Sequence, residues 1–249
     1  MDRLAAQGAR FDHAYAAAPI CTASRAALLT GRSPARLGFE FVIKSPAATP
    51  SAEHPLRPPP YPLDLPLTET TVAEVLGPAG YATGYFGKWH LAQHHGSYLR
   101  WSPTHGPLQQ GYHEGTDDFG DHTYGDVTRP ESERAPLPPG DYGRDPLTAR
   151  TVAFLRAHRD HPFYLHFSPY YVHDPFRTRA TWLVERYVAR LPAGTDRRLD
   201  QYVARLGAEL DAAPQTHDLV LIMSAVNRID VTALEALTRQ AQLRRQLDD

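Results

Sequence analysis

The sequence predicts an α/β fold built around a largely parallel central sheet. Two stretches carry this prediction, because residues 68–86 and residues 145–167 each run from a helical pattern into an apolar strand pattern. Helix–strand alternation of this kind is typical of parallel sheets, in which each crossover helix covers a face of the sheet. We therefore expect the functional side chains to gather at the carboxyl ends of the strands.

The composition is that of an ordinary globular protein and excludes several classes. Hydrophobic residues make up 42% and charged residues 22% of the 249 residues, enough for one large domain or two small ones. The net charge of −2, without a basic stripe, argues against nucleic acid as a partner. No apolar run approaches the ~18–20 residues that span a bilayer, and no secretory leader is visible, so the cytoplasm is the default location. One cysteine excludes an internal disulfide.

The stretch CTASRAALLTGR, residues 21–32, holds that only cysteine. Its apolar run, closed by Gly31, predicts a helix with Cys21 in the first turn. A thiol at a helix N-terminus beside the guanidinium of Arg25 experiences positive potential from both, which favours a reactive nucleophile. The alternative is that Cys21 is a small buried core residue.

The segments on either side of this stretch are less regular. Residues 2–6 are predicted as a short helix and residues 9–14 as a short strand. Residues 38–66 are rich in proline, which cannot sustain a helix or a central strand. A long surface loop that shapes the mouth of a site is therefore expected there.

Regular structure returns with TETTVAEVLGPAG, which predicts a helix capped by Thr68 or Thr70 and ended by Gly80. A strand over 81–86 follows, and then the run GKWHLA. The apolar face of the helix is predicted to consist of Val72, Val75 and Leu76.

The second helix–strand unit begins at Asp145. Its helix has an apolar face of Leu147, Val152, Phe154 and Leu155, and its strand alternates through Phe163, Leu165 and Phe167. The histidines between the two units fit no zinc pattern, so we assign no catalytic role to His94, His95, His105, His113 or His122.

Two of these motifs together resemble the type I sulfatases, which depend on formylglycine and belong to the alkaline-phosphatase-like superfamily. CTASRAALLTGR is similar to the Cys-x-Pro/Ala-Ser-Arg signature with its Leu-Thr-Gly-Arg ending, and GKWH is similar to the second signature. The positions that fall on the first signature are Cys21, Ser24, Arg25, Leu29, Thr30, Gly31 and Arg32. The resemblance implies an alkaline-phosphatase-like sandwich with a largely parallel sheet, incomplete at both ends.

The resemblance also implies a catalytic set. Cys21 would be oxidised to formylglycine, whose hydrated aldehyde is the nucleophile, and Arg25 and Lys88 would stabilise developing charge. Lys88 would also bind a sulfate oxygen, and His90 would contact the formylglycine hydroxyl and help expel sulfate. By the same match His173 would lie near the leaving oxygen, contact substrate and protonate the departing alcohol.

Calcium is the cofactor that the resemblance implies, with formylglycine at Cys21 among its ligands. The family's aspartate pair would precede Met1, and residues 224–227 carry no acid where the family places Asp-Asn. The other metal ligands are therefore expected to be missing from this chain. On that basis we expect the isolated chain to bind calcium weakly and to turn over slowly or not at all.

The tail predicts a separate unit. Residues 1–195 are interpreted as a partial sulfatase catalytic domain, and residues 196–249 as a helix–strand–helix tail. The tail resembles part of a STAS domain, the module found on sulfate-permease-type transporters. Thr232, which matches a phosphorylatable position in related proteins, is interpreted as a residue near a helix N-terminus.

The predicted function is hydrolysis of a sulfate ester, in a small molecule or a glycan, after conversion of Cys21 by a formylglycine-generating enzyme. Two alternatives stay open. A phosphodiester or phosphonate monoester hydrolase of the same superfamily would share the nucleophile. A non-catalytic sulfatase/STAS fusion fragment would keep an intact thiol.

Overall fold

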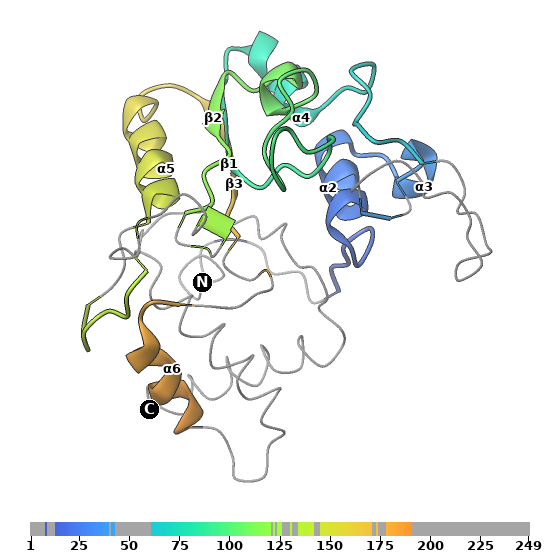
Figure 1. The fold of residues 1–249 in the computed structure, drawn as a ribbon. Helices are drawn as coiled ribbons and strands as arrows, with labels where there is room; N and C mark the ends of the chain where they lie inside the picture. Colours follow the sequence, from blue (N-terminus) through green and yellow to red (C-terminus); the bar gives the residue numbers. More distant parts are fainter. Residues whose placement is uncertain are drawn as a thin grey trace, which may run out of the picture.

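A computed structural model describes residues 8, 13–39, 41–42, 61–120, 122, 124–125, 130, 134–141, 145–170, 173 and 178–190. Figure 1 shows the arrangement of the elements in this part of the chain. In chain order they are α2 (Cys21–Thr30), α3 (Pro34–Leu37), α4 (Val72–Leu76), the 3₁₀ turn η1 (Gly77–Ala79), β1 (Ala82–Gly87), the 3₁₀ turn η2 (Pro107–Gln109), β2 (Glu114–Thr116), α5 (Pro146–Ala157), β3 (Phe163–Ser168) and α6 (Thr181–Val188).

The described strands form a parallel sheet in the order β2-β1-β3. β1 lies in the centre and pairs with β3 along its whole length, from Ala82 opposite Phe163 to Gly87 opposite Ser168. The sheet and its helices confirm the predicted α/β fold with parallel strands. Because all three strands are parallel, the segments that follow β1 and β3 both leave the sheet at the carboxyl ends of the strands.

Helices cover both faces of this sheet, α5 on one side and α2 and α4 on the other (Figure 1). Consecutive side chains of a strand point to opposite faces. Tyr85 accordingly packs in the core that contains Leu29 of α2, whereas Phe86 packs with Phe154 of α5. Burial on both faces explains why β1 is apolar without alternation.

Helix α2 begins and ends as the sequence predicts. Gly31 adopts the left-handed conformation at φ 67°, and its N–H donates to the Ala27 carbonyl. One face of the helix, which includes Ala26 and Leu29, is fully buried. Cys21 is therefore the first residue of a helix that is fixed by its own core contacts.

Helix α4 differs from the prediction in its cap and its buried face. The cap is Thr71, whose hydroxyl accepts from the Glu74 N–H, while the Glu74 carboxylate accepts from the Thr71 N–H. This reciprocal cap starts the helix later than Thr68 or Thr70. The buried face also differs from the prediction, since Ala73 is buried and Val75 is 61% exposed.

The second unit is close to its prediction at the start and departs from it along the strand. Asp145 caps α5 by accepting from the Thr148 N–H at 2.9 Å. Leu147 and Phe154 are buried as predicted. Burial in β3 increases from Phe163 toward Ser168 instead of alternating, because both faces of the sheet are covered near its carboxyl end.

Several predicted elements lie outside the described residues. They are the helix over 2–6, most of the strand over 9–14, loop residues 43–60, and all of the tail, including Thr232 and the helices and strand predicted within 196–249. Residues 13–14, which are described, are not in a strand. No helix in the described part of the chain combines the length and apolar character that crossing a bilayer requires.

Two glycines with left-handed backbones can be used to test how closely β1 and β3 approach each other at their carboxyl ends. At Gly87, with φ 104°, an added Cβ would collide with the Ser168 carbonyl, whereas at Gly80, with φ 87°, it would meet nothing within 4 Å. We expect Gly80→Ala to lower the free energy of unfolding by about 1 kcal/mol, the cost of the backbone alone. Gly87→Ala should cost about 3 kcal/mol or more, because the clash adds to that strain. Urea denaturation of both variants checks this, and equal losses would contradict it.

Candidate active site

Arg25 lies at the centre of the candidate site. It projects from α2, is 1% exposed, and its Nη1 donates to three acceptors on two strands. These are the Lys88 carbonyl at 2.6 Å, the Ser168 hydroxyl at 2.6 Å and the Tyr85 hydroxyl at 3.1 Å. The guanidinium therefore ties the Cys21 helix to the carboxyl ends of β1 and β3.

Lys88 follows β1 directly and is fully buried, which excludes the surface position that most lysines occupy. Its Nζ donates to the Cys21 Sγ at 3.2 Å. Burial lowers the pKa of Lys88 to about 8, an effect that the Cys21 charge opposes and the Arg25 charge reinforces. The lysine thus lies against the predicted nucleophile and is close to losing its charge near neutral pH.

His90 lies two residues further on, where the chain turns. It is 3% exposed and has φ 54°, a left-handed conformation that is uncommon outside glycine. Its carbonyl accepts from the Thr22 hydroxyl at 3.0 Å. The first turn of α2 and the GKWH segment are thereby held to each other at two points.

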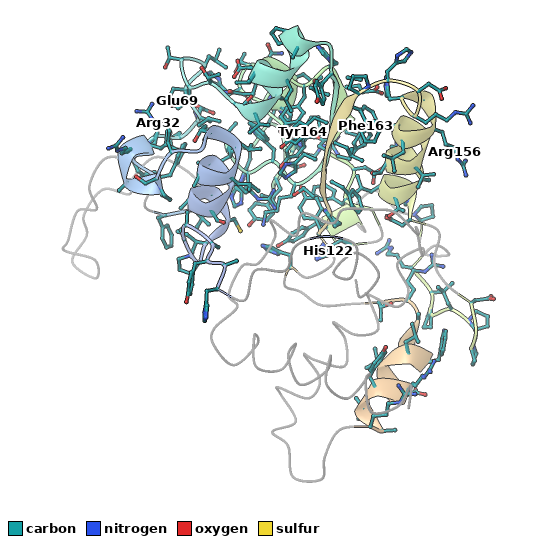
Figure 2. The ribbon with its side chains drawn as sticks, turned by 180° about the vertical axis from the view of Figure 1, so that it is seen from behind. Arg32, Glu69, His122, Arg156, Phe163 and Tyr164 are labelled. Carbon is teal, nitrogen blue, oxygen red and sulfur yellow. The ribbon has the colours of Figure 1, made fainter. Side chains whose placement is uncertain are left out.

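His173 lies beyond the end of β3 and is 6% exposed. Its Nδ1 shares a hydrogen bond of 3.1 Å with the Tyr124 hydroxyl, and its carbonyl lies 2.9 Å from the His122 Nε2. The His122 Nδ1 accepts from the Tyr124 N–H, so His122 carries its proton on Nε2 and donates it to the His173 carbonyl. Figure 2 shows His122 near the carboxyl end of the sheet, away from Phe163 at the start of β3.

The structure thus brings Cys21, Arg25, Lys88 and His90 into one connected cluster and places His173 in a neighbouring one. Sequence reasoning missed the residues that hold these clusters together, including His122. Tyr85 and Ser168 were missed because a strand tyrosine and a strand-end serine belong to no motif. The available signal was their position at the carboxyl ends of the two predicted strands.

A fourth missed residue, His166, supports the Arg25 cluster through Tyr85. Its ring stacks on Tyr85, with centroids 4.6 Å apart and planes 8° apart. Burial, reinforced by the Arg25 charge, lowers the pKa of His166 to about 3. His166 is therefore neutral at physiological pH and adds no charge to the site.

The described side chains do not form the oxygen cage that calcium requires. Within the ranges that the structure covers, no three His, Cys, Asp or Glu side chains gather closely enough to hold a metal ion. The cluster around Cys21 contains two nitrogen cations and a thiol, which are not calcium ligands in these forms.

The charges and the unused donors of this cluster favour the binding of an anion. Lys88 contacts the thiol, Arg25 is bonded to the Lys88 carbonyl, and no acidic side chain of the described residues is hydrogen-bonded to either cation. The Arg25 Nε and Nη2 are buried and donate to no acceptor in the described part of the chain. A small tetrahedral dianion next to Cys21 would offset this positive charge.

Comparisons with known proteins identify the family of the chain. The model of a family described as "Sulfatase" matches residues 1–228. The chain belongs to the sulfatase family. Arylsulfatase A of Bos taurus is 34% identical over 202 residues, which cover 70% of this chain and 36% of that protein. Arylsulfatase G of Homo sapiens is 48% identical over 100 residues, 39% of this chain and 16% of that protein.

Among solved structures, the crystal structure of Ps i-CgsB in complex with k-i-k-neocarrahexaose is similar in fold. Its TM-score is 0.50 at 20% identity, over 80% of this chain and 44% of that one. This sulfatase-family chain therefore spans less than half the length of these relatives. Sulfatases in general use a divalent cation and a formylglycine. The family match extends past residue 195 to residue 228, and none of these comparisons supports the STAS resemblance.

The hydrogen bonds of Tyr85 can be tested by removing one oxygen atom. Tyr85→Phe removes the hydroxyl that accepts from Arg25 and donates to the Lys88 carbonyl at 2.6 Å. We expect it to lower the free energy of unfolding by about 2 kcal/mol, because a buried charge loses an acceptor. Thermal and urea denaturation provide the measurement.

Tyr170→Phe is the matched control. Tyr170 is also fully buried, but its hydroxyl has no hydrogen-bond partner among the described residues. Its removal should leave stability unchanged or slightly increased. An equal loss in the two variants would show that the Tyr85 hydroxyl contributes no specific hydrogen bond.

Proposed function

We propose that this chain belongs to a sulfuric ester hydrolase in which Cys21, converted to formylglycine, carries the nucleophile. The observation that supports this most directly is the 3.2 Å contact between the Lys88 Nζ and the Cys21 Sγ. In the unconverted chain the sulfur stands in for an oxygen of the hydrated aldehyde, the group that attacks sulfur in this chemistry. A cation at hydrogen-bond distance is what such an attack on an anionic ester needs, because negative charge builds up on the sulfate oxygens.

Arg25 and Lys88 would bind the sulfate group. Lys88 reaches the nucleophile from β1, and Arg25 has two buried donors, Nε and Nη2, that no described residue occupies. Because both cations are buried, their attraction for an anion is screened less than at a surface. They would stabilise the negative charge that develops on the sulfate oxygens.

The two histidines would each transfer a proton, His173 when the alcohol leaves and His90 when sulfate is released. His173 would protonate the departing alcohol, and its hydrogen bond to Tyr124 supports a fixed ring orientation for that step. His90 would take up the proton whose removal releases sulfate. Its carbonyl contact with Thr22 supports a place beside the first turn of α2.

The substrates that we infer are sulfate esters of small molecules or glycans. The relatives include arylsulfatases and an N-acetylgalactosamine-6-sulfatase of Sus scrofa, 39% identical over 46% of this chain and 19% of that protein. We place the catalytic unit in residues 1–195, with a formylglycine-generating enzyme as partner. Calcium is the expected cation, with Cys21, as formylglycine, as its ligand in this chain.

Conversion of Cys21 is the first test. In chain that is co-expressed with a formylglycine-generating enzyme, mass spectrometry of the tryptic peptide around Cys21 should show a loss of about 18 Da, the replacement of thiol by aldehyde. An aldehyde-specific hydrazide probe should label the same peptide. Cys21→Ala is the control and should take no label. An intact thiol after co-expression would contradict the proposed function and favour a non-catalytic role.

Turnover separates the two enzyme hypotheses. Converted chain, supplied with calcium, is compared on 4-nitrophenyl sulfate and on a matched aryl phosphodiester. Because the described residues form no cage for calcium, we expect slow turnover or none, and rapid turnover would contradict that expectation. Any measurable preference for the sulfate ester supports the proposal, and a preference for the phosphodiester would replace it with the second hydrolase class.

The pH dependence of sulfate binding tests the role of Lys88. Its pKa of about 8 means that the ammonium loses its proton as pH rises through that value, while inorganic sulfate stays a dianion. Affinity for sulfate, measured by calorimetry from about pH 6.5 to about pH 9.5, should therefore be high below about pH 8. Above it, the affinity should fall by up to about tenfold per pH unit.

Two variants identify the titrating group. Lys88→Met should bind sulfate weakly at every pH and lack the step. Cys21→Ala should keep the step but move it to lower pH, because the Cys21 charge raises the pKa of Lys88. A step that disappears in Cys21→Ala would assign the titration to the thiol instead.

A further inference from the structure

A continuous line of aromatic rings connects the two histidines of the site. His90 contacts His94 with ring centroids 5.6 Å apart, and His94 contacts Tyr98 at 4.8 Å. Tyr98 contacts Tyr124 at 5.3 Å, and Tyr124 contacts His173 at 5.5 Å. The rings of His94 and Tyr124 stand nearly perpendicular to that of Tyr98, at 90° and 80°. The line therefore runs from the sulfate-releasing side of the site to the leaving-group side.

Tyr98 is the exposed member of this line. It is 42% exposed, whereas the terminal rings, His90 and His173, are 3% and 6% exposed. A single exposed aromatic residue on a protein surface needs no explanation. An exposed ring fixed between the buried histidines of a candidate active site is different, because aromatic side chains there offer a flat apolar surface to a ligand.

The backbone beside the exposed Tyr98 is strained. The next residue, Leu99, has φ 64° and is 1% exposed, packed with Phe119 and Tyr170. In the described part of the chain, Leu99 and His90 are the residues other than glycine with positive φ. A left-handed leucine is strained, and such strain persists mainly at functional sites.

Electrostatics place the Tyr98 ring near the nucleophile. Burial raises the pKa of the Tyr98 hydroxyl, the negative charge of Cys21 raises it further, and a hydrogen bond from Tyr124 opposes both effects. Tyr98 is therefore neutral at physiological pH, and its ring is available for contact with an uncharged part of a ligand.

The proposed roles indicate where the alcohol part of an ester would lie. With its sulfate group at Arg25 and Lys88 and its leaving oxygen at His173, the group on that oxygen would extend past His173. Tyr98, which contacts the hydrogen-bond partner of His173, is the most exposed of the described rings in this line and offers a surface on that side. We propose that Tyr98 determines specificity by packing against the face of a ring, aryl or pyranose, in the alcohol part of the ester. This inference rests on the proposed function.

The test measures binding to unconverted chain, which holds the thiol and does not turn the ligands over. Calorimetry is used with inorganic sulfate, methyl sulfate, 4-nitrophenyl sulfate and glucose 6-sulfate. For wild-type protein, we expect at least one ring-bearing ester to bind about tenfold more tightly than methyl sulfate. Tyr98→Ala should remove that advantage and change the affinity for methyl sulfate by less than about twofold. Tyr98→Phe, which keeps the ring, should retain the advantage.

Phe163→Ala is the matched control. Phe163 is 37% exposed and begins β3, at the opposite end of the sheet from the site (Figure 2). It should leave the affinities for all four ligands unchanged. Whether 4-nitrophenyl sulfate or glucose 6-sulfate responds to Tyr98→Ala assigns the ring as aryl or pyranose.

The two possible failures are distinguishable. If neither inorganic sulfate nor methyl sulfate binds to wild-type chain, the proposed function fails at the anion site. If both bind, but no ring-bearing ester binds better than methyl sulfate, the role of Tyr98 is overturned. Equal loss of all four ligands in Tyr98→Ala would also overturn it, because it would show a structural role.

Discussion

The guanidinium of Arg25 lies buried between α2 and the carboxyl ends of β1 and β3, where its Nη1 donates to Tyr85, Lys88 and Ser168. A charged group in this position needs several acceptors to offset the loss of its hydration. Its planar donors then orient the acceptors as well as itself. Arg32, in the same motif, differs: it is half exposed and pairs with Glu69 at the surface, a contact worth at most about 1 kcal/mol (Figure 2).

The electrostatic consequence is a site in which two buried cations have no described carboxylate as a hydrogen-bond partner. Arg25 and Lys88 are both buried near each other. The charge of Arg25 and the burial of Lys88 both lower the pKa of Lys88. Such an arrangement costs stability in the free protein, and an anion that binds between the two cations returns part of that cost. The contacts that hold α2 on the sheet and the proposed affinity for an anion therefore have the same origin.

The sequence predicted the parts of this arrangement that belong to motifs. Cys21 and Arg25 share one short helix, and Lys88 follows a strand, so their convergence followed from helix–strand alternation. Partners supplied by tertiary packing could not be predicted in this way. The cap at Thr71 depends on a side-chain bond to Glu74 that displaced two equally plausible threonines. His122 belongs to no ligand pattern, and its role depends on the backbone carbonyl of His173.

The pKa values of His166 and Lys88 set the pH range in which Arg25 and Lys88 are both charged and His166 is neutral. His166, stacked on Tyr85, has a pKa of about 3 against an ordinary value of 6.5. Between these values the unfolded chain binds a proton that the folded chain does not, so the folded state loses stability as pH falls through this range. Lys88 loses its charge above a pKa of about 8. Between the two limits His166 is neutral and both cations are charged, which is the state that the proposed binding of a sulfate group requires.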